Sequence, residues 1–253
     1  MTHQLDDHRL AAELAEKAGQ LLLDLRARLH SEDAPPAVLK AEGDRQAHEL
    51  LMAELRSARP DDAILSEEGK DDFARLSAER TWIVDPLDGT REYSEVPRSD
   101  WAVHVALVVD NHPIAGAVAL PALGRVLSTA DVPVLSADPA SPPRMIVSRS
   151  RPPAAATHVA ELIGAELVQM GSAGAKTMAV VRGDCEIYVH SGGQYEWDSC
   201  APVAVAAAAG CHTSRLDGSE LVYNQQDVYL PDLVVCRREL ADVVLDALAS
   251  FKA

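Results

Sequence analysis

The residues best suited to chemistry stand together in one short segment, Asp85-Pro86-Leu87-Asp88-Gly89-Thr90. The segment follows an apolar run at 82–84 that predicts a buried strand, so we expect two carboxylates and a hydroxyl in a tight turn at its end. Pro86 favours an extended Asp85, and Gly89 permits backbone angles that a Cβ would forbid. Oxygen atoms of Asp85, Asp88 and the Leu87 carbonyl would then share one spot, which suits hard divalent cations, above all Mg²⁺.

Other acidic residues decide between this interpretation and an ordinary surface turn, for which Asp, Pro and Gly are also typical. Glu67 and Glu68 follow a short predicted strand at 64–65, and Asp198 precedes a predicted helix at 199–209. Taken alone, the glutamate pair could be solvated and Asp198 could be a simple helix cap. Together with Asp85 and Asp88 they favour a metal site.

Three segments of the chain resemble the signatures of the inositol monophosphatase superfamily of lithium-sensitive, Mg²⁺-dependent phosphatases. They are residues 85–90, Ser66-Glu67-Glu68 and Trp197-Asp198-Ser199-Cys200-Ala201. The similarity extends over nearly the whole chain. Within the superfamily, the segments 89–93 (Gly-Thr-Arg-Glu-Tyr) and 194–198 (Gln-Tyr-Glu-Trp-Asp) resemble the bacterial 3′(2′),5′-bisphosphate nucleotidases of the CysQ type.

The resemblance implies a mixed α/β (α+β) fold, a five-layered αβαβα sandwich with the active site between its halves. We expect an N-terminal subdomain at 1–135 that carries most metal ligands and a C-terminal subdomain at 144–253 that carries Asp198 and the substrate-side residues. Two or three Mg²⁺ ions would orient the phosphate ester and stabilise the leaving oxygen. The implied ligands are Glu67, Asp85, the Leu87 carbonyl, Asp88 and Asp198.

The catalytic residues that the resemblance implies are Thr90 and Glu67, which would orient and deprotonate the attacking water. The backbone N–H groups of Gly89 and Thr90 would hold the phosphate at a helix N-terminus. Asp44 is expected to support the metal ligands from behind, and Glu68 either does the same or is solvated. No nucleophile motif for a phosphorylated side chain is visible, so direct attack by water is our interpretation.

The sequence indicates the residues that contact the substrate less clearly than the metal ligands. The expected substrate-binding residues are Leu87, Asp88, Gly89, Thr90, Lys176 and Asp198. Lys176 lies in a segment, 171–176, that resembles a family segment meeting the sugar or a second phosphate. It is a candidate cation for that phosphate, with a solvated lysine as the alternative and Arg149 as the second candidate. His104 and Cys200 are interpreted as packed core residues.

The favoured function is hydrolysis of the 3′-phosphate of adenosine 3′,5′-bisphosphate (PAP) to AMP and phosphate, which clears a by-product of sulfate assimilation. 3′-Phosphoadenosine phosphosulfate is a second candidate substrate. The alternatives are an inositol-1-monophosphatase, a fructose-1,6-bisphosphatase and a non-catalytic phosphometabolite sensor. Retention of both the metal ligands and Thr90 argues against the sensor. The resemblance also suggests a homodimer.

The composition of the chain excludes several classes of binding partner. The net charge of −16 argues against nucleic-acid polymers and anionic membranes, and it requires local positive charge for a phosphate substrate. No apolar run approaches the roughly 20 residues that span a membrane, and no signal peptide is visible. The four cysteines show no C-x-x-C pair. Reduced thiols in a cytoplasmic protein are therefore the expectation.

Hydrophobic periodicity predicts the elements that position these residues. We expect helices at 10–29 and 47–55, a strand pair at 101–109 and 114–120 with a hairpin turn at 110–113, and a third strand at 125–129. A linker at 137–143 leads to strands at 145–147, 187–189 and 233–235, which alternate with helices at 153–163, 199–209 and 239–248. Ser199 is expected to cap the helix at 199–209, with Pro202 in its first turn.

Overall fold

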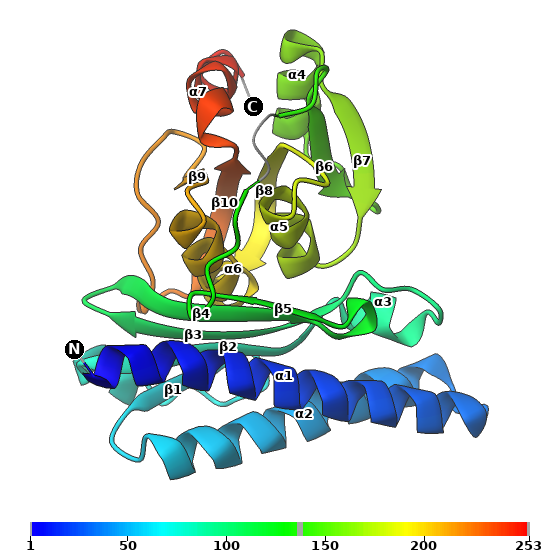
Figure 1. Ribbon diagram of the computed structural model, residues 1–253, viewed down its shortest axis with the longest axis vertical. Coiled ribbons are helices and arrows are strands. Elements are labelled where there is room, and N and C mark those ends of the chain that lie inside the picture. The colour runs from blue at the N-terminus through cyan, green and yellow to red at the C-terminus, as the bar shows by residue number, and fades with distance from the viewer. Residues whose placement is uncertain (1, 136–138, 252–253) are drawn as a thin grey trace.

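The computed structural model describes residues 2–135 and 139–251, and its elements stack in five layers (Figure 1). Two long helices cover the first sheet, two helices lie between the sheets, and two helices cover the second sheet. The predicted αβαβα sandwich is therefore confirmed. The helices are α1 (Thr2–Ser31), α2 (Pro36–Ala58), α3 (Thr90–Ser94), α4 (Ala154–Ile163), α5 (Ala173–Val181), α6 (Glu196–Ala208) and α7 (Ala241–Ala249), with short 3₁₀ turns at Ala74–Ser77, Pro121–Leu123 and Arg238–Leu240.

The first sheet has the strand order β1-β2-β3-β4-β5, with β1 parallel to β2 and the other pairs antiparallel. Its strands are β1 (Ala63–Ser66), β2 (Arg80–Asp88), β3 (Ala102–Val109), β4 (His112–Leu120) and β5 (Arg125–Ser128). Asp110 and Asn111 connect β3 to β4 with φ values of 50° and 64°. Two consecutive positive φ angles match the twist of a tight hairpin, so the predicted hairpin is confirmed.

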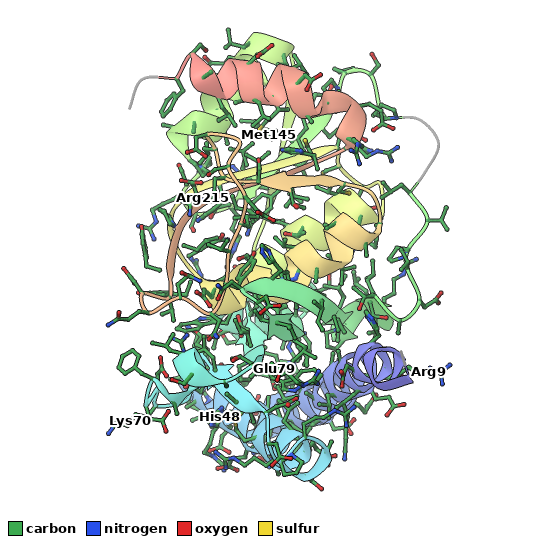
Figure 2. The ribbon with its side chains drawn as sticks, turned by 90° about the vertical axis from the view of Figure 1, so that its left-hand side faces the viewer. Arg9, His48, Lys70, Glu79, Met145 and Arg215 are labelled. Atoms are coloured by element: carbon green, nitrogen blue, oxygen red, sulfur yellow. The ribbon has the colours of Figure 1, made fainter. Side chains whose placement is uncertain are left out.

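The second sheet has the strand order β7-β6-β8-β10-β9. Its strands are β6 (Arg144–Ser148), β7 (Glu166–Met170), β8 (Ile187–Tyr195), β9 (His212–Ser214) and β10 (Tyr229–Cys236). Figure 2 shows Met145 and Arg215 in the half of the molecule that contains this second sheet. His48, Lys70 and Glu79 lie in the half that contains the first sheet. The two sheets lie on either side of the segment 136–143 in sequence, and the division into subdomains at 135 and 144 stays a prediction.

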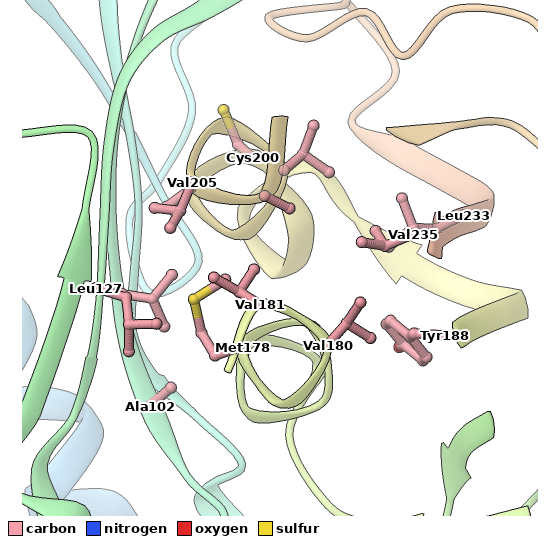
Figure 3. Packing of buried hydrophobic residues seen from close by; sticks show 14 of the residues in the cluster. Ala102, Leu127, Met178, Val180, Val181, Tyr188, Cys200, Val205, Leu233 and Val235 are labelled. Carbon is pink, nitrogen blue, oxygen red and sulfur yellow. The ribbon is translucent and has the colours of Figure 1, made fainter. Parts of the chain in front are cut away.

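Buried apolar side chains fill each space between layers. In the central space, side chains from both sheets pack against α5 and α6 (Figure 3). Met178 and Val205 face Ala102 and Leu127 of the first sheet, and Val180 faces Tyr188 of the second. One continuous cluster thus joins both halves. Because close-packed interiors resist local displacement, the ends of α5 and α6 are held firmly against the first sheet.

Four sequence-based predictions need correction. β2 continues through Asp88, with a shift of register between Asp85 and Asp88, so the acidic segment is a bulged strand end and not a tight turn. The second helix was predicted only at 47–55, but α2 begins at Pro36, because proline is well suited to the first turn of a helix. Residues 40–44 are therefore helical.

The other two corrections concern the second half. α6 begins at Glu196, so Ser199 does not cap it and Pro202 lies in its interior. The strands β7 and β9 and the helix α5 were not predicted, since β7 is largely polar or exposed, β9 has three residues, and the Ala- and Gly-rich α5 is buried all round. Of the expected linker, residues 137 and 138 lie outside the described residues.

Candidate active site

The parallel pairing of β1 and β2 brings the first two acidic residues together. Ser66 is opposite Val84 in the register, so Glu67 and Asp85 follow at the same edge of the sheet. The Glu67 backbone N–H donates to the Val84 carbonyl over 3.3 Å. Glu67 is exposed as a residue, yet its carboxyl group is close enough to Asp85 for a hydrogen bond between the two. Two segments that are 18 residues apart thereby deliver one carboxyl pair.

Asp85 also belongs to a compact triad of carboxylates, with Asp88 and Asp198. The bulge in β2 turns both Asp85 and Asp88 to the inside, and the first turn of α6 adds Asp198. One oxygen atom from each lies within 4.8 Å of the others. Asp85 is only 1 % exposed, and Asp88 7 %. Such a cluster of oxygen ligands fits a hard divalent cation.

The N-terminus of α5 donates hydrogen bonds to one member of the triad, Asp88. The Asp88 carboxylate accepts hydrogen bonds from the Gly174 backbone N–H over 2.6 Å, the Ala173 backbone N–H over 3.1 Å, and the Ser172 hydroxyl. Burial raises the pKa of Asp88, but the hydrogen bond and charge of His104, the Ser172 hydroxyl and the charge of Lys176 outweigh it and lower the pKa to about 2. Asp88 is therefore an anion at every physiological pH.

The remaining carboxyl groups have the opposite tendency. Burial, reinforced by the neighbouring carboxylates, raises the pKa of Asp85 well above its usual range and that of Asp198 to about 6. Burial likewise raises the pKa of Glu67 to about 7, although its hydrogen bond with Asp85 opposes the rise. These groups repel one another when they are all ionised. A divalent cation would remove that repulsion, so the donor set fits the metal that the sequence predicts.

His104 ties the triad to α6. Its side chain is fully buried on β3, and Nδ1 donates to the Trp197 carbonyl over 3.0 Å. Nε2 lies 3.3 Å from Asp88 Oδ2. A Cβ on Gly174 would come within 1.9 Å of Nε2, so only glycine fits there. The expectation of a packed histidine is confirmed, but its contacts with both Asp88 and Trp197 were not foreseen.

Thr90 lies between two oxygen atoms. Its hydroxyl is 3.1 Å from the Leu87 carbonyl and 3.2 Å from Asp44 Oδ1. A hydroxyl carries one proton and two lone pairs, so Thr90 can donate to one of these oxygens and still accept from a water. Burial, with help from the charge of Glu68, raises the pKa of Asp44 to about 6.

Gly89 holds this arrangement in place. Its φ is 83°, and a Cβ would meet the Asp100 carbonyl at 3.2 Å and the Ser172 Cβ at 3.0 Å. The positive φ and the crowding both require glycine. The turn into α3 is therefore built against the segment that precedes α5.

The two candidate cations for a second phosphate are differently placed from what the sequence suggested. Lys176 is 5 % exposed, and its ammonium donates to the Ser172 carbonyl over 2.6 Å and to the Gly171 carbonyl over 3.3 Å. Arg149 bridges Glu92, at 2.6 Å, and Glu95, at 2.8 Å. Neither is a solvated side chain, and either would have to leave these partners to meet a phosphate.

Two features of the site were not predicted. Ser172 both accepts from the Ala175 backbone N–H, as a helix cap, and donates to Asp88. Its signal was a serine before a small-residue helix, in a segment considered only for substrate contact. The contact between Asp44 and Thr90 joins residues 46 positions apart, and no local pattern indicates it.

Comparison with known proteins supports the same family from sequence and from structure. The sequence profile of the inositol monophosphatase family matches residues 5–250. The 3′-phosphoadenosine 5′-phosphate phosphatase of Mycobacterium tuberculosis is 50% identical over 240 residues, which cover 92% of this chain and 89% of that one. The Mycobacterium leprae protein of the same name is 49% identical, with coverage of 96% and 93%.

More distant relatives agree. The 3′(2′),5′-bisphosphate nucleotidase CysQ of Escherichia coli K12 is 31% identical over 74% of this chain and 80% of its own. Among solved structures, CysQ from Bacteroides thetaiotaomicron has a TM-score of 0.73 and 27% identity, covering 92% of this chain and 97% of that chain. An inositol monophosphatase from Zymomonas mobilis reaches a TM-score of 0.76 at 22% identity, with coverage of 96% and 98%, which establishes the shared fold.

Proposed function

Because this chain belongs to the inositol monophosphatase family, we propose that it hydrolyses the 3′-phosphate of PAP to give AMP and phosphate. The mycobacterial relatives are named for that substrate, and the nucleotidase CysQ matches as well. The observation that carries the proposal at the site is the triad of Asp85, Asp88 and Asp198, together with the Thr90 hydroxyl that contacts the Leu87 carbonyl between two of its members. The chain is a phosphatase; the identity of its phosphoester is the proposal.

The cofactor we propose is Mg²⁺, with two or three ions held by Glu67, Asp85, the Leu87 carbonyl, Asp88 and Asp198. The raised pKa values of Glu67, Asp85 and Asp198 support cations at this place. When bound, the ions polarise the phosphoryl oxygens, lower the pKa of the attacking water and stabilise the leaving oxygen.

The residues of the chain orient the reactants. Thr90 accepts a hydrogen bond from the attacking water while its own proton points to Asp44 or to the Leu87 carbonyl. Glu67, which lies at the same edge of the sheet as Asp85, takes the proton of that water as general base. The backbone N–H groups of Gly89 and Thr90 bind the phosphoryl oxygens. No step requires a phosphorylated side chain.

Phosphate release from three esters tests the proposal directly. We expect kcat/KM to be highest for PAP, with inositol 1-phosphate and fructose 1,6-bisphosphate far behind, and turnover to need Mg²⁺ and to stop in EDTA. Preference for inositol 1-phosphate would replace the nucleotidase by an inositol monophosphatase. Binding of PAP without any phosphate release would favour the sensor. 3′-Phosphoadenosine phosphosulfate is the second substrate to assay.

Several further properties accompany the proposal as predictions. Li⁺ should inhibit in an uncompetitive or mixed way by displacing one Mg²⁺ in the product complex. We expect a cytoplasmic homodimer that takes part in sulfate assimilation, and analytical ultracentrifugation measures its mass. None of the helices within residues 2–135 and 139–251 combines the length and the apolar composition of a membrane-spanning segment.

A further inference from the structure

Three aromatic side chains form a cluster, which we call the aromatic platform, at the N-terminal end of α6. The ring of Tyr195 is stacked on Trp197, with centroids 5.0 Å apart and planes inclined by 14°. Tyr229, at the start of β10, meets Tyr195 edge-on at 6.0 Å. Tyr195 and Tyr229 are each 44 % exposed, whereas Trp82 and Trp101 are fully buried. Burial of an aromatic side chain is strongly favourable, so a cluster of exposed aromatic rings indicates a binding surface.

The platform is directly connected to the acidic triad. The Tyr195 backbone N–H donates to Asp198 Oδ2 over 2.7 Å. On the other side, the Trp197 carbonyl accepts from His104, which also contacts Asp88. A ligand whose phosphate lies on the triad therefore lies beside the turn of α6 whose backbone carries Tyr195 and Trp197.

The surface next to the platform is open. Gly192 and Gly193 precede it on β8 with φ values of 86° and 82°, and no atom lies within 4 Å of the position of a Cβ on either. The Gly193 backbone N–H donates to the Tyr229 hydroxyl over 3.1 Å, which fixes that ring against this end of β8. A planar group can therefore approach without displacing side chains at these two glycines.

We propose that the aromatic platform binds the nucleobase of the substrate by stacking, and that Tyr195 is its principal contact. The inference rests on the proposed function and deepens it: the site selects nucleoside 3′-phosphates over other phosphomonoesters. Stacking on an aromatic face is sequence-tolerant because every base has a π-face. The platform thus recognises a planar base rather than adenine alone.

The test compares PAP with a base-free analogue, 1-deoxyribose 3,5-bisphosphate, on wild type and variants. Loss of one base–aromatic stack typically weakens binding by about 5- to 100-fold. The ratio of kcat/KM for PAP to that for the analogue should fall by this factor in Tyr195→Ala and recover in Tyr195→Phe, which keeps the ring. The matched control is Phe73→Ala, an exposed aromatic residue elsewhere, for which the ratio should not move.

The outcomes separate this inference from the function on which it rests. If wild type hydrolyses PAP well but Tyr195→Ala lowers kcat/KM equally for both substrates, the ring of Tyr195 supports the site that both substrates share, and the platform is refuted. If Tyr195→Ala does not fold, Tyr195→Leu keeps an apolar side chain without an aromatic face, and an unaltered ratio in that variant also refutes the platform. If wild type does not prefer PAP over inositol 1-phosphate, the proposed function itself fails first.

Discussion

The N-termini of two helices lie at the acidic triad, but one donates hydrogen bonds to a triad member and the other carries one. α5 donates two backbone N–H groups and the Ser172 hydroxyl to Asp88, whose pKa falls to about 2. α6 instead carries its own triad member, Asp198, whose pKa burial raises to about 6. Both helix ends have the same dipole direction. Since both carboxylates are buried, the difference teaches that the groups facing each one decide its pKa: His104, Ser172 and Lys176 lower that of Asp88, whereas the charge of Asp88 adds to the rise for Asp198.

Asp85 is the member that no helix end supports, so its replacement should have the largest effect. In Asp85→Asn, a neutral amide cannot balance a divalent cation, and Mg²⁺-dependent kcat/KM for PAP should fall by about 10³-fold or more. The exposed Asp61→Asn is the control for a lost negative charge and should retain its activity. Phosphate release measures both. Wild-type turnover in Asp85→Asn would remove this residue from the ligand set.

Thr90→Ala separates water orientation from metal binding. Loss of the hydroxyl between Asp44 and the Leu87 carbonyl should lower kcat by roughly 10²-fold, the scale of one acid–base contribution. Thr90→Ser keeps the hydroxyl and should recover most of the rate. The Mg²⁺ concentration at half-maximal rate should change little. If that concentration rises steeply while kcat survives, Thr90 acts on the metal and not on the water.

How much the sequence could predict differs between the two helix ends. The strand before Asp85 and Asp88, the glutamates after 64–65 and the aspartate before a helix were all visible as local patterns, and the structure brings the three aspartates into one triad. The helix α5 was missed, since its small residues show no apolar face, and with it the donors to Asp88. Such a contact spans more than 80 residues, and only the packing of α5 between the sheets creates it.

Lys176 shows a second limit of sequence-based prediction, since its side chain does not point where its segment suggested. Its segment was recognised, but the side chain lies in the interior against two carbonyl groups and the ring of Tyr188. Burial lowers its pKa, although Asp88 opposes this. Sequence patterns register that a lysine is present, whereas the direction of its side chain depends on the helix that carries it.

Ser172→Ala tests the donors of α5 with a smaller effect. The substitution removes both the cap of α5 and one hydrogen bond to Asp88, so the free energy of unfolding should fall by about 1–3 kcal/mol. For a chain of this size that corresponds to a melting temperature lower by roughly 2–4 °C per kcal/mol. Ser31→Ala, in an exposed last turn, is the control and should shift it little. An equally small shift in Ser172→Ala would show that the cap contributes nothing.

The raised pKa values predict how Mg²⁺ stabilises the protein as pH changes. Without metal, folded Glu67, Asp85 and Asp198 keep protons to a higher pH than in the unfolded chain, so stability from these groups falls as pH rises from about 5 to 8. Mg²⁺ competes with those protons. The gain in melting temperature on adding Mg²⁺ should therefore grow over this range. A gain that is independent of pH would mean that the ions bind elsewhere.

The most direct test of the contrast between α5-supported and unsupported carboxylates is thermal unfolding of Asp85→Asn and Asp88→Asn in EDTA at about pH 7.5. Asp85→Asn removes a carboxyl group that is costly to ionise, so its melting temperature should lie above that of wild type. Asp88→Asn replaces an anion that accepts from α5 and should melt several degrees below wild type. Shifts in the same direction for both variants would contradict the account.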